Sequence, residues 1–271
     1  MIRLNDYLDK LSIIKVLSFF LLIMLVLTLI PMIFKFDLGS LSFKFILYLI
    51  MVLFFVYNFK KIDSTENRDD SFVLALKNDF SSIFEVANIF QISFIVIANI
   101  LFVSAIYFLL SYLSSLSLIP FDSPLFGDFQ SIGLGILLLY FLTIVILSPI
   151  MEEILFRGIF LRRFHKGLNN ITLAILISSI LFGVCHSFGG IIGAIYFGIC
   201  VSILYIKSGN ILVPIFAHFL NNIISFLLAL SGIENFIQGN SIVIILMIAL
   251  AIVSNFILFK GIINEWPDKM V

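Results

Sequence analysis

The sequence predicts an all-α membrane protein, a polytopic helical bundle of about eight transmembrane helices with both termini in the cytoplasm. The first observation behind this prediction is composition, since 62% of the 271 residues are hydrophobic and only 12% are charged. That is more apolar surface than a soluble core can bury. The second is that the apolar residues fall into runs of bilayer-spanning length, and the third is that Lys and Arg are distributed unevenly between those runs. We therefore expect residues 1–271 to form a single integral membrane domain.

The apolar runs define the expected helices. Each run is close to the roughly 20 residues that an α-helix needs to cross the hydrocarbon core. The first run is too long for a signal peptide and no small-residue cleavage site follows it, so we interpret it as a span. In chain order the runs are approximately residues 16–34, 41–59, 89–113, 131–151 with a tail, 171–188, 191–206, 211–230 and 241–259.

The fourth run continues from about Gly133 to Phe164, which is too long for one straight crossing. Pro149 has no backbone N–H, so it is expected to kink the helix and to free a carbonyl of the preceding turn. Inside a membrane that carbonyl needs a polar partner or water. We expect a water-filled cavity that opens to the cytoplasm.

Basic residues set the expected orientation. If the spans alternate, only Lys35 and Lys44 among the loop residues fall on one side, and Lys and Arg are retained on the cytoplasmic side. The polar segment 60–88 is then a cytoplasmic loop, with an amphipathic helix from about Ser71 that lies on the headgroups as a solvated linker. The residues on the predicted cytoplasmic side are Arg3, Lys10, Lys15, Lys60, Lys61, Arg68, Lys77, Arg162, Arg163, Lys166, Lys207, Lys260 and Lys269.

Net charge excludes one class of partner. Lys plus Arg number 16 and Asp plus Glu number 16, so no overall field attracts nucleic acid. Cys185 and Cys200 lie inside apolar runs, and we interpret them as packing residues without a disulfide. The lipid bilayer is the first partner that the sequence predicts, and no oligomeric state is specified by it.

The few polar residues inside the spans are the candidates for function, because a charged side chain in hydrocarbon must face the bundle interior or a wet cavity. Glu152 and Glu153 are the acidic residues within a span. Glu153 and Arg157 are four residues apart and share a helix face, whereas Glu152 points about 100° away. The two glutamates are therefore expected to have different partners.

Two later spans carry pairs of the same kind. Phe182 and His186 share one face, which sets an aromatic ring beside an imidazole, and His218 and Asn222 share a face of the seventh span. Asn221 is three residues from His218 rather than four and ranks second to Asn222. The helical rise gives these groups similar depths in the bilayer, so we expect them to converge.

Together these residues resemble the CPBP family of intramembrane proteases, also called the Abi family, which includes type II CAAX prenyl proteases and bacterial enzymes linked to bacteriocin processing and self-immunity. The family pattern is E-E-x-x-x-R, then F-x-x-x-H, then H-x-x-x-N or D. All three occur here in order, as EEILFR, FGVCH and HFLNN. The motif-bearing core covers about residues 131–230, and the first three spans match only in hydropathy and number. The resemblance implies an intramembrane endopeptidase that acts on a membrane-associated protein or peptide.

Peptide hydrolysis assigns roles to these residues. It needs a base to deprotonate water, donors for the oxyanion and a proton for the leaving amine. A carboxyl group in an apolar cavity has its pKa raised toward neutrality, which suits a base. Glu152 is the predicted base and matches the first glutamate of the family motif. His186 is expected to hold the water or assist proton transfer, and His218 and Asn222 are expected to stabilise the oxyanion.

The remaining motif residues are predicted to support the site. Glu153 and Arg157 form a buried pair that fixes the helix and tunes the local field, and a purely structural role for the pair stays open. Phe182 lies beside His186 and is placed in the same supporting group. Ser187 is not expected to act as a nucleophile, because helical spacing directs it away from His186.

No cofactor is expected to be required. Zinc stays open, and Glu152, His186 and His218 are its predicted ligands if a metal is bound. The sequence has no H-E-x-x-H motif, and the amide of Asn222 is a poor zinc ligand but a good oxyanion donor. Water activated by glutamate without a metal is therefore the preferred mechanism.

Other functions and the cellular setting are also weighed from the sequence. A non-catalytic membrane scaffold or bacteriocin-immunity protein stays open, as does a proton-coupled transporter, which also uses buried Glu and His. The Ile-, Phe-, Asn- and Lys-rich composition is typical of an AT-rich bacterium, so a multi-pass protein of the bacterial plasma membrane is expected. A peptide pheromone, a bacteriocin leader or a membrane-protein tail is the expected substrate, ahead of a prenylated CAAX protein. We expect cleavage on the cytoplasmic side or just within the membrane.

Overall fold

The computed structural model describes residues 2–66, 71–121, 129 and 132–268. All regular elements in that part of the chain are helices, which confirms the predicted all-α class. Seven helical stretches within it are long and apolar enough to cross a membrane, so the protein is a multi-pass membrane protein. They are α2 (Ile13–Phe34), α3 (Ser40–Thr65), α5 (Ile89–Ser115), the continuous helix Leu134–Leu168, α10 (Ile191–Ser208), α11 (Leu212–Ser231) and α13 (Ser241–Asn264).

The remaining predicted span contains a shorter apolar helix. α9 runs from Ile171 to Val184, so the predicted end at residue 188 is corrected to 184. The chain continues through a turn into the 3-10 helix η3 (Phe188–Gly190) and then into α10. Adjacent glycines at 189 and 190 weaken helix continuation at this point. His186 therefore lies in a turn after the helix and not within a span.

The motif-bearing helix contains two π-helical segments. It consists of α6 (Leu134–Tyr140), the π-helix η1 (Phe141–Leu147), α7 (Ser148–Glu153), the π-helix η2 (Ile154–Leu161) and α8 (Arg162–Leu168). In η1 the Ser148 N–H bonds to the Thr143 carbonyl five residues back. The next residue is Pro149, which has no N–H, so the same pattern leaves the Ile144 carbonyl without a donor from its own helix. Wide turns of this kind frequently lie at functional sites.

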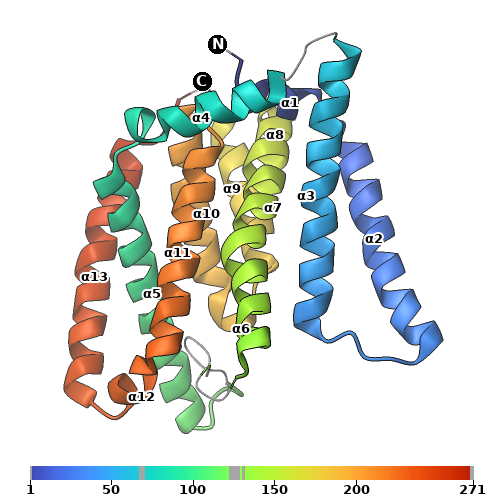
Figure 1. Ribbon diagram of the computed structural model, residues 1–271. Coiled ribbons are helices and arrows are strands. Elements are labelled where there is room, and N and C mark those ends of the chain that lie inside the picture. Colours follow the sequence, from blue (N-terminus) through green and yellow to red (C-terminus); the bar gives the residue numbers. More distant parts are fainter. Residues whose placement is uncertain (1, 67–70, 122–128, 130–131, 269–271) are drawn as a thin grey trace.

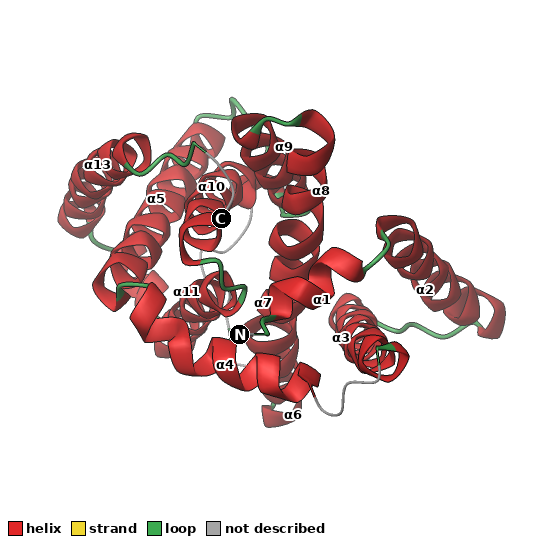
Figure 2. Ribbon diagram, turned by 90° about the horizontal axis from the view of Figure 1, so that it is seen from above, coloured by secondary structure: helices red, strands yellow, loops and turns green. Residues whose placement is uncertain are grey.

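The helices form a main bundle with a hairpin beside it. Figure 1 shows α2 and α3 standing to one side of the bundle, with α5 and α13 at the opposite edge. α1 (Leu4–Lys10) and α4 (Ser71–Val86) lie across one end, and Figure 2 shows them from above, crossing over that end. α8 and the last turn of α13 reach the same end, whereas α12 (Ile233–Gln238) joins α11 to α13 at the other. The N-terminal helix α1 and the C-terminal end of α13 thus lie on one side, as an even number of crossings requires. That this side is cytoplasmic stays a prediction.

α4 confirms the predicted amphipathic helix, but it is packed against the bundle and is not a solvated linker. The Asp79 carboxylate accepts the Leu4 N–H at 2.9 Å, and the Asn210 amide donates to the Asp79 carbonyl at 2.7 Å. The Asn210 amide also donates to the Ser82 hydroxyl at 3.2 Å. Asp79 and Ser82 are buried. Polar side chains of α4 therefore face inward, where they join α1 to the start of α11.

Asp79 gives this end of the molecule a pH-dependent stability. Burial raises the pKa of the Asp79 carboxyl above its ordinary 3.8, and the Leu4 N–H and Arg3 lower it in part. A raised pKa favours the protonated Asp79 carboxyl in the folded state. Its stabilisation of the fold is therefore fully present below pH 3.8 and is lost as the pH rises through the pKa of Asp79 in the folded protein. Asp79→Asn keeps an acceptor for Leu4 and removes the charge. We expect its melting temperature to fall less than that of wild type between about pH 4 and pH 7.

Thermal unfolding in detergent across that pH range measures the difference. Glu85→Gln is the matched control, because Glu85 is an exposed carboxylate on the same helix. If the melting temperatures of the wild type and Asp79→Asn change equally with pH, burial of Asp79 does not cause the pH dependence of stability.

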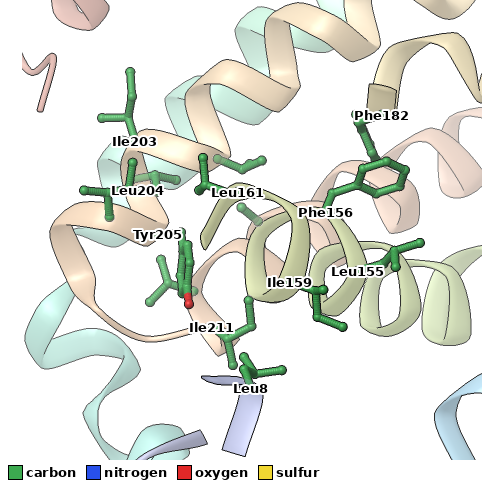
Figure 3. Packing of buried hydrophobic residues seen from close by; sticks show 14 of the residues in the cluster. Leu8, Leu155, Phe156, Ile159, Leu161, Phe182, Ile203, Leu204, Tyr205 and Ile211 are labelled. Carbon is green, nitrogen blue, oxygen red and sulfur yellow. The ribbon is translucent and has the colours of Figure 1, made fainter. Parts of the chain in front are cut away.

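The buried core lies around η2, α9 and α10. Figure 3 shows Phe156 of η2 and Phe182 of α9 turned toward one another, and their rings meet edge to face at 5.3 Å. α9 and α10 approach closely at Gly183, where an added Cβ would lie 2.2 Å from Cγ1 of Ile195. This close contact holds the C-terminal end of α9, and the turn that carries His186, against the bundle.

Candidate active site

Glu152 lies on α7 with one carboxylate oxygen held by two hydroxyl groups. The Tyr48 hydroxyl, on α3, donates to Oε1 at 3.2 Å, and the Ser148 hydroxyl, one turn earlier on α7, donates to the same oxygen. Sequence reasoning missed both residues. The spacing of four between Ser148 and Glu152 is a local signal that identifies Ser148. No spacing links Tyr48 to Glu152, because the two are 104 residues apart.

A cavity of about 910 Å³ lies beside Glu152. The polar residues that line it are Thr28, Asp37, Ser40, Lys44, Tyr48, Tyr140, Ser148, Glu152, Cys185, His186, Ser187, His218 and Asn222. All four residues predicted to be catalytic therefore share one cavity. Ser187 belongs to this lining, contrary to the prediction, because α9 ends at Val184 and helical spacing no longer applies.

The cavity extends away from the basic end of the molecule. Its other wall is formed by the α2–α3 hairpin, including Phe20, Leu27 and Leu47, and it continues to Asp37 and Ser40 at the connection between those helices. Figure 1 places that connection at the end opposite α1 and α4. The prediction that the cavity opens on the side of the basic loops is therefore corrected. α1 and α4 lie across that end, whereas the hairpin stands away from the bundle at the other.

Glu153 and Arg157 form the predicted pair and are completely buried. The Arg157 guanidinium donates to Glu153 Oε1 at 3.0 Å, and both side chains have 0% exposure. His218 Nδ1 lies 2.8 Å from the same Glu153 oxygen. A carboxylate only accepts, so Nδ1 carries the hydrogen of this bond. Glu153 thereby fixes the ring of His218, a connection that spacing along one helix does not reveal.

Phe182 lies at the centre of this network. The Arg157 guanidinium lies over its ring, 4.3 Å from the centroid, and the ring centroids of His186 and His218 lie at 4.7 Å and 5.6 Å. Arg157 also donates to the Gly198 carbonyl at 3.1 Å, and a Cβ at Gly198 would lie 2.9 Å from the same guanidinium. Phe182 and Gly198 thus leave one position for the arginine.

His186 is held by the end of α9. Its Nδ1 lies 2.9 Å from the Phe182 carbonyl, which also accepts the Cys185 backbone N–H at 3.3 Å. Because a carbonyl only accepts, Nδ1 carries the hydrogen and Nε2 is left as an acceptor. The predicted proximity of Phe182 and His186 is confirmed, although the turn, and not a continuous helix, creates it.

Asn222 takes the carbonyl that Pro149 leaves free. Its amide donates to the Ile144 carbonyl at 2.8 Å, which is the partner that the sequence required for the fourth span. Asn221 faces another helix, since it accepts from Asn99 of α5 at 3.0 Å. The ranking of Asn222 above Asn221 agrees with the cavity lining, which includes Asn222 alone of the two.

Glu152, His186 and His218 are the alternative metal ligands. Within the described ranges no three His, Cys, Asp or Glu side chains are grouped closely enough to hold a metal ion. The three side chains line one cavity, where Glu152 Oε1, His186 Nδ1 and His218 Nδ1 bond to protein groups. Bonds of this kind at the second nitrogen of a histidine are compatible with a metal at the first, so zinc stays an open prediction.

Comparison with known proteins agrees with this geometry. Residues 134–224 match the family model described as type II CAAX prenyl endopeptidase Rce1-like. The motif-bearing core is Rce1-like. The matched region contains all seven predicted site residues and runs from α6 into α11. The resemblance inferred from the three motifs is therefore confirmed for this core, whereas α3 and Tyr48 lie outside the match.

Two curated bacterial proteins are similar to part of the chain. One, from Bacillus subtilis (strain 168), is named "Putative membrane peptidase YdiL" and is 33% identical over 97 residues, which are 35% of this chain and 39% of that protein. The other, from Escherichia coli, is named "Uncharacterized 24.3 kDa protein" and is 39% identical over 116 residues, 41% of this chain and 52% of that protein. The chain thus aligns with about half or less of each relative's length. No solved structure matches it.

Proposed function

We propose that the protein is an intramembrane endopeptidase that hydrolyses a peptide bond of a membrane-associated protein or peptide with water activated by Glu152. The observation that carries the proposal is the shared cavity, into which a carboxylate and two imidazoles converge from α7, the turn after α9, and α11. The Rce1-like core and the relative named as a membrane peptidase support this reaction class.

The proposed mechanism divides the steps among these groups. Glu152 takes a proton from water, which attacks the peptide carbonyl, and the protonated carboxyl then gives the proton to the leaving amine. Nε2 of His186 accepts a hydrogen bond from the attacking water, since Nδ1 is occupied by the Phe182 carbonyl. His218, backed by Glu153, stabilises the oxyanion when its ring is doubly protonated, because Nε2–H then faces the cavity.

Asn222 is proposed to act with His218, but one of its two amide N–H donors is already in use. An amide has two N–H donors, and the bond to Ile144 occupies one. The second N–H remains for the oxyanion. Asn222 therefore joins two roles, holding the wide turn before Pro149 and lining the reaction site.

The proposed setting is the bacterial plasma membrane, with the bilayer and a peptide or protein substrate as partners. Both curated relatives are bacterial proteins. A peptide pheromone, a bacteriocin leader or a membrane-protein tail is the preferred substrate. The cavity lies among membrane-spanning helices, which favours cleavage within the membrane.

Purified protein and a library of internally quenched fluorogenic peptides test the proposal. We expect cleavage of at least one peptide, with both fragments identified by mass spectrometry, and we expect the same rate after treatment with a chelator. Activity that the chelator abolishes and zinc restores would contradict the metal-free mechanism. Intact peptides in both detergent and liposomes would contradict the protease proposal and favour a scaffold, or a transporter if proton movement is detected.

A further inference from the structure

A carboxylate that works as a base needs one oxygen held still and the other open to the water. Both hydroxyl donors at Glu152 converge on Oε1, from Tyr48 at 3.2 Å and from Ser148. In the described part of the chain no hydrogen bond reaches Oε2. Glu152 is only partly buried and lines the cavity. The arrangement therefore fixes the carboxylate from one side and leaves Oε2 for the substrate water.

Ser148 donates to Glu152, while Asn222 supplies the donor to the carbonyl one turn earlier. A helical serine commonly turns its hydroxyl back to the carbonyl four residues earlier. For Ser148 that carbonyl belongs to Ile144, and the Asn222 amide already donates to it at 2.8 Å. The Ser148 hydroxyl donates to Glu152 instead. The core thus supplies one donor to Glu152 by itself.

The second donor comes from outside the Rce1-like core. Tyr48 lies on α3, whereas the family match covers residues 134–224. Phe43 and Leu47 of α3 line the cavity with apolar surface, and Ser40 and Lys44 are its other polar residues on that helix. If Tyr48 served merely as another part of this wall, the ring alone would suffice. Its hydroxyl is instead placed on the oxygen that Ser148 also holds.

We propose that Tyr48 is a positioning residue for Glu152, so that the α2–α3 hairpin completes the active site of the Rce1-like core. This inference rests on the proposed function, in which Glu152 is the base. The Tyr48 hydroxyl holds Oε1 and keeps Oε2 directed at the water. The hairpin is therefore part of the reaction site as well as a wall of the substrate cavity.

Kinetics of the full-length protein test the role of the hydroxyl. With a fluorogenic peptide that the wild type cleaves, Tyr48→Phe is expected to lower kcat roughly tenfold to a hundredfold and to leave KM unchanged, the range for losing a hydrogen bond to a charged group. Tyr57→Phe is the matched control, since Tyr57 lies on the same helix and is 63% exposed. We expect wild-type kcat for that control and an unchanged melting temperature for both variants.

An infrared measurement tests the same contact without activity. The carboxylate band of Glu152 is identified as the difference between the wild type and Glu152→Gln, and we expect Tyr48→Phe to shift it and Tyr57→Phe to leave it in place. An unshifted band, or wild-type kcat in Tyr48→Phe, would overturn the inference. Loss of cleavage in Glu152→Gln with full activity in Tyr48→Phe would reject only the positioning role of Tyr48 and would leave Glu152 as the base. Cleavage that survives in Glu152→Gln would reject the proposed function itself.

Discussion

The Glu152→Gln variant is expected to fold normally and to cleave a peptide substrate about 100 to 10,000 times more slowly than the wild type. Glutamine has the same shape, and its amide oxygen can still accept from Tyr48 and Ser148. It cannot take a proton from water. The expected loss is therefore in kcat, with little change in the melting temperature.

The comparison is made with purified wild type, Glu152→Gln and Glu85→Gln. Glu85 is an exposed carboxylate of α4, so its variant controls for the loss of one charge and should keep full activity. A scaffold or immunity protein would keep its phenotype in Glu152→Gln. A transporter would lose proton coupling with no peptide shortened. Either result would remove Glu152 from the role of a hydrolytic base.

Spacing along single helices predicted the motif pairs correctly. Glu153 and Arg157 bond directly, because residues four apart in a helix share a face. Phe182 also lies against His186, although the turn after α9 creates that contact. The requirement for a partner at the carbonyl freed by Pro149 was also predictable, since an unpaired carbonyl is costly in a membrane. The identity of that partner was not, because Asn222 reaches Ile144 from another helix.

The features that were missed depend on contacts between distant segments. Tyr48 is an ordinary residue of an apolar span, and only the packing of α3 against α7 brings it to Glu152. Spacing alone also misplaced Ser187, because it assumed a helix that continues beyond Val184. The direction of the cavity depends on α1 and α4 lying across one end, which hydropathy does not indicate.

Breaking the buried pair is expected to have the largest effect on stability. Glu153→Ala leaves the Arg157 guanidinium without its carboxylate at a site with 0% exposure, and an unpaired buried charge of this kind costs about 3–5 kcal/mol. It also removes the acceptor of His218 Nδ1. The melting temperature and the rate of peptide cleavage should therefore both fall. A melting temperature equal to that of the wild type would show that Arg157 finds another partner or is hydrated.

A double variant separates the two roles of Glu153. Glu153→Leu with Arg157→Met replaces the ion pair by apolar side chains, and such exchanges are often neutral or stabilising. We expect it to recover most of the melting temperature lost in Glu153→Ala. Cleavage should stay low, because the His218 ring has no acceptor to fix Nδ1. Recovery of both stability and activity would mean that the pair only holds the helices together, and that His218 is oriented by its ring contacts with Phe182 and Phe197.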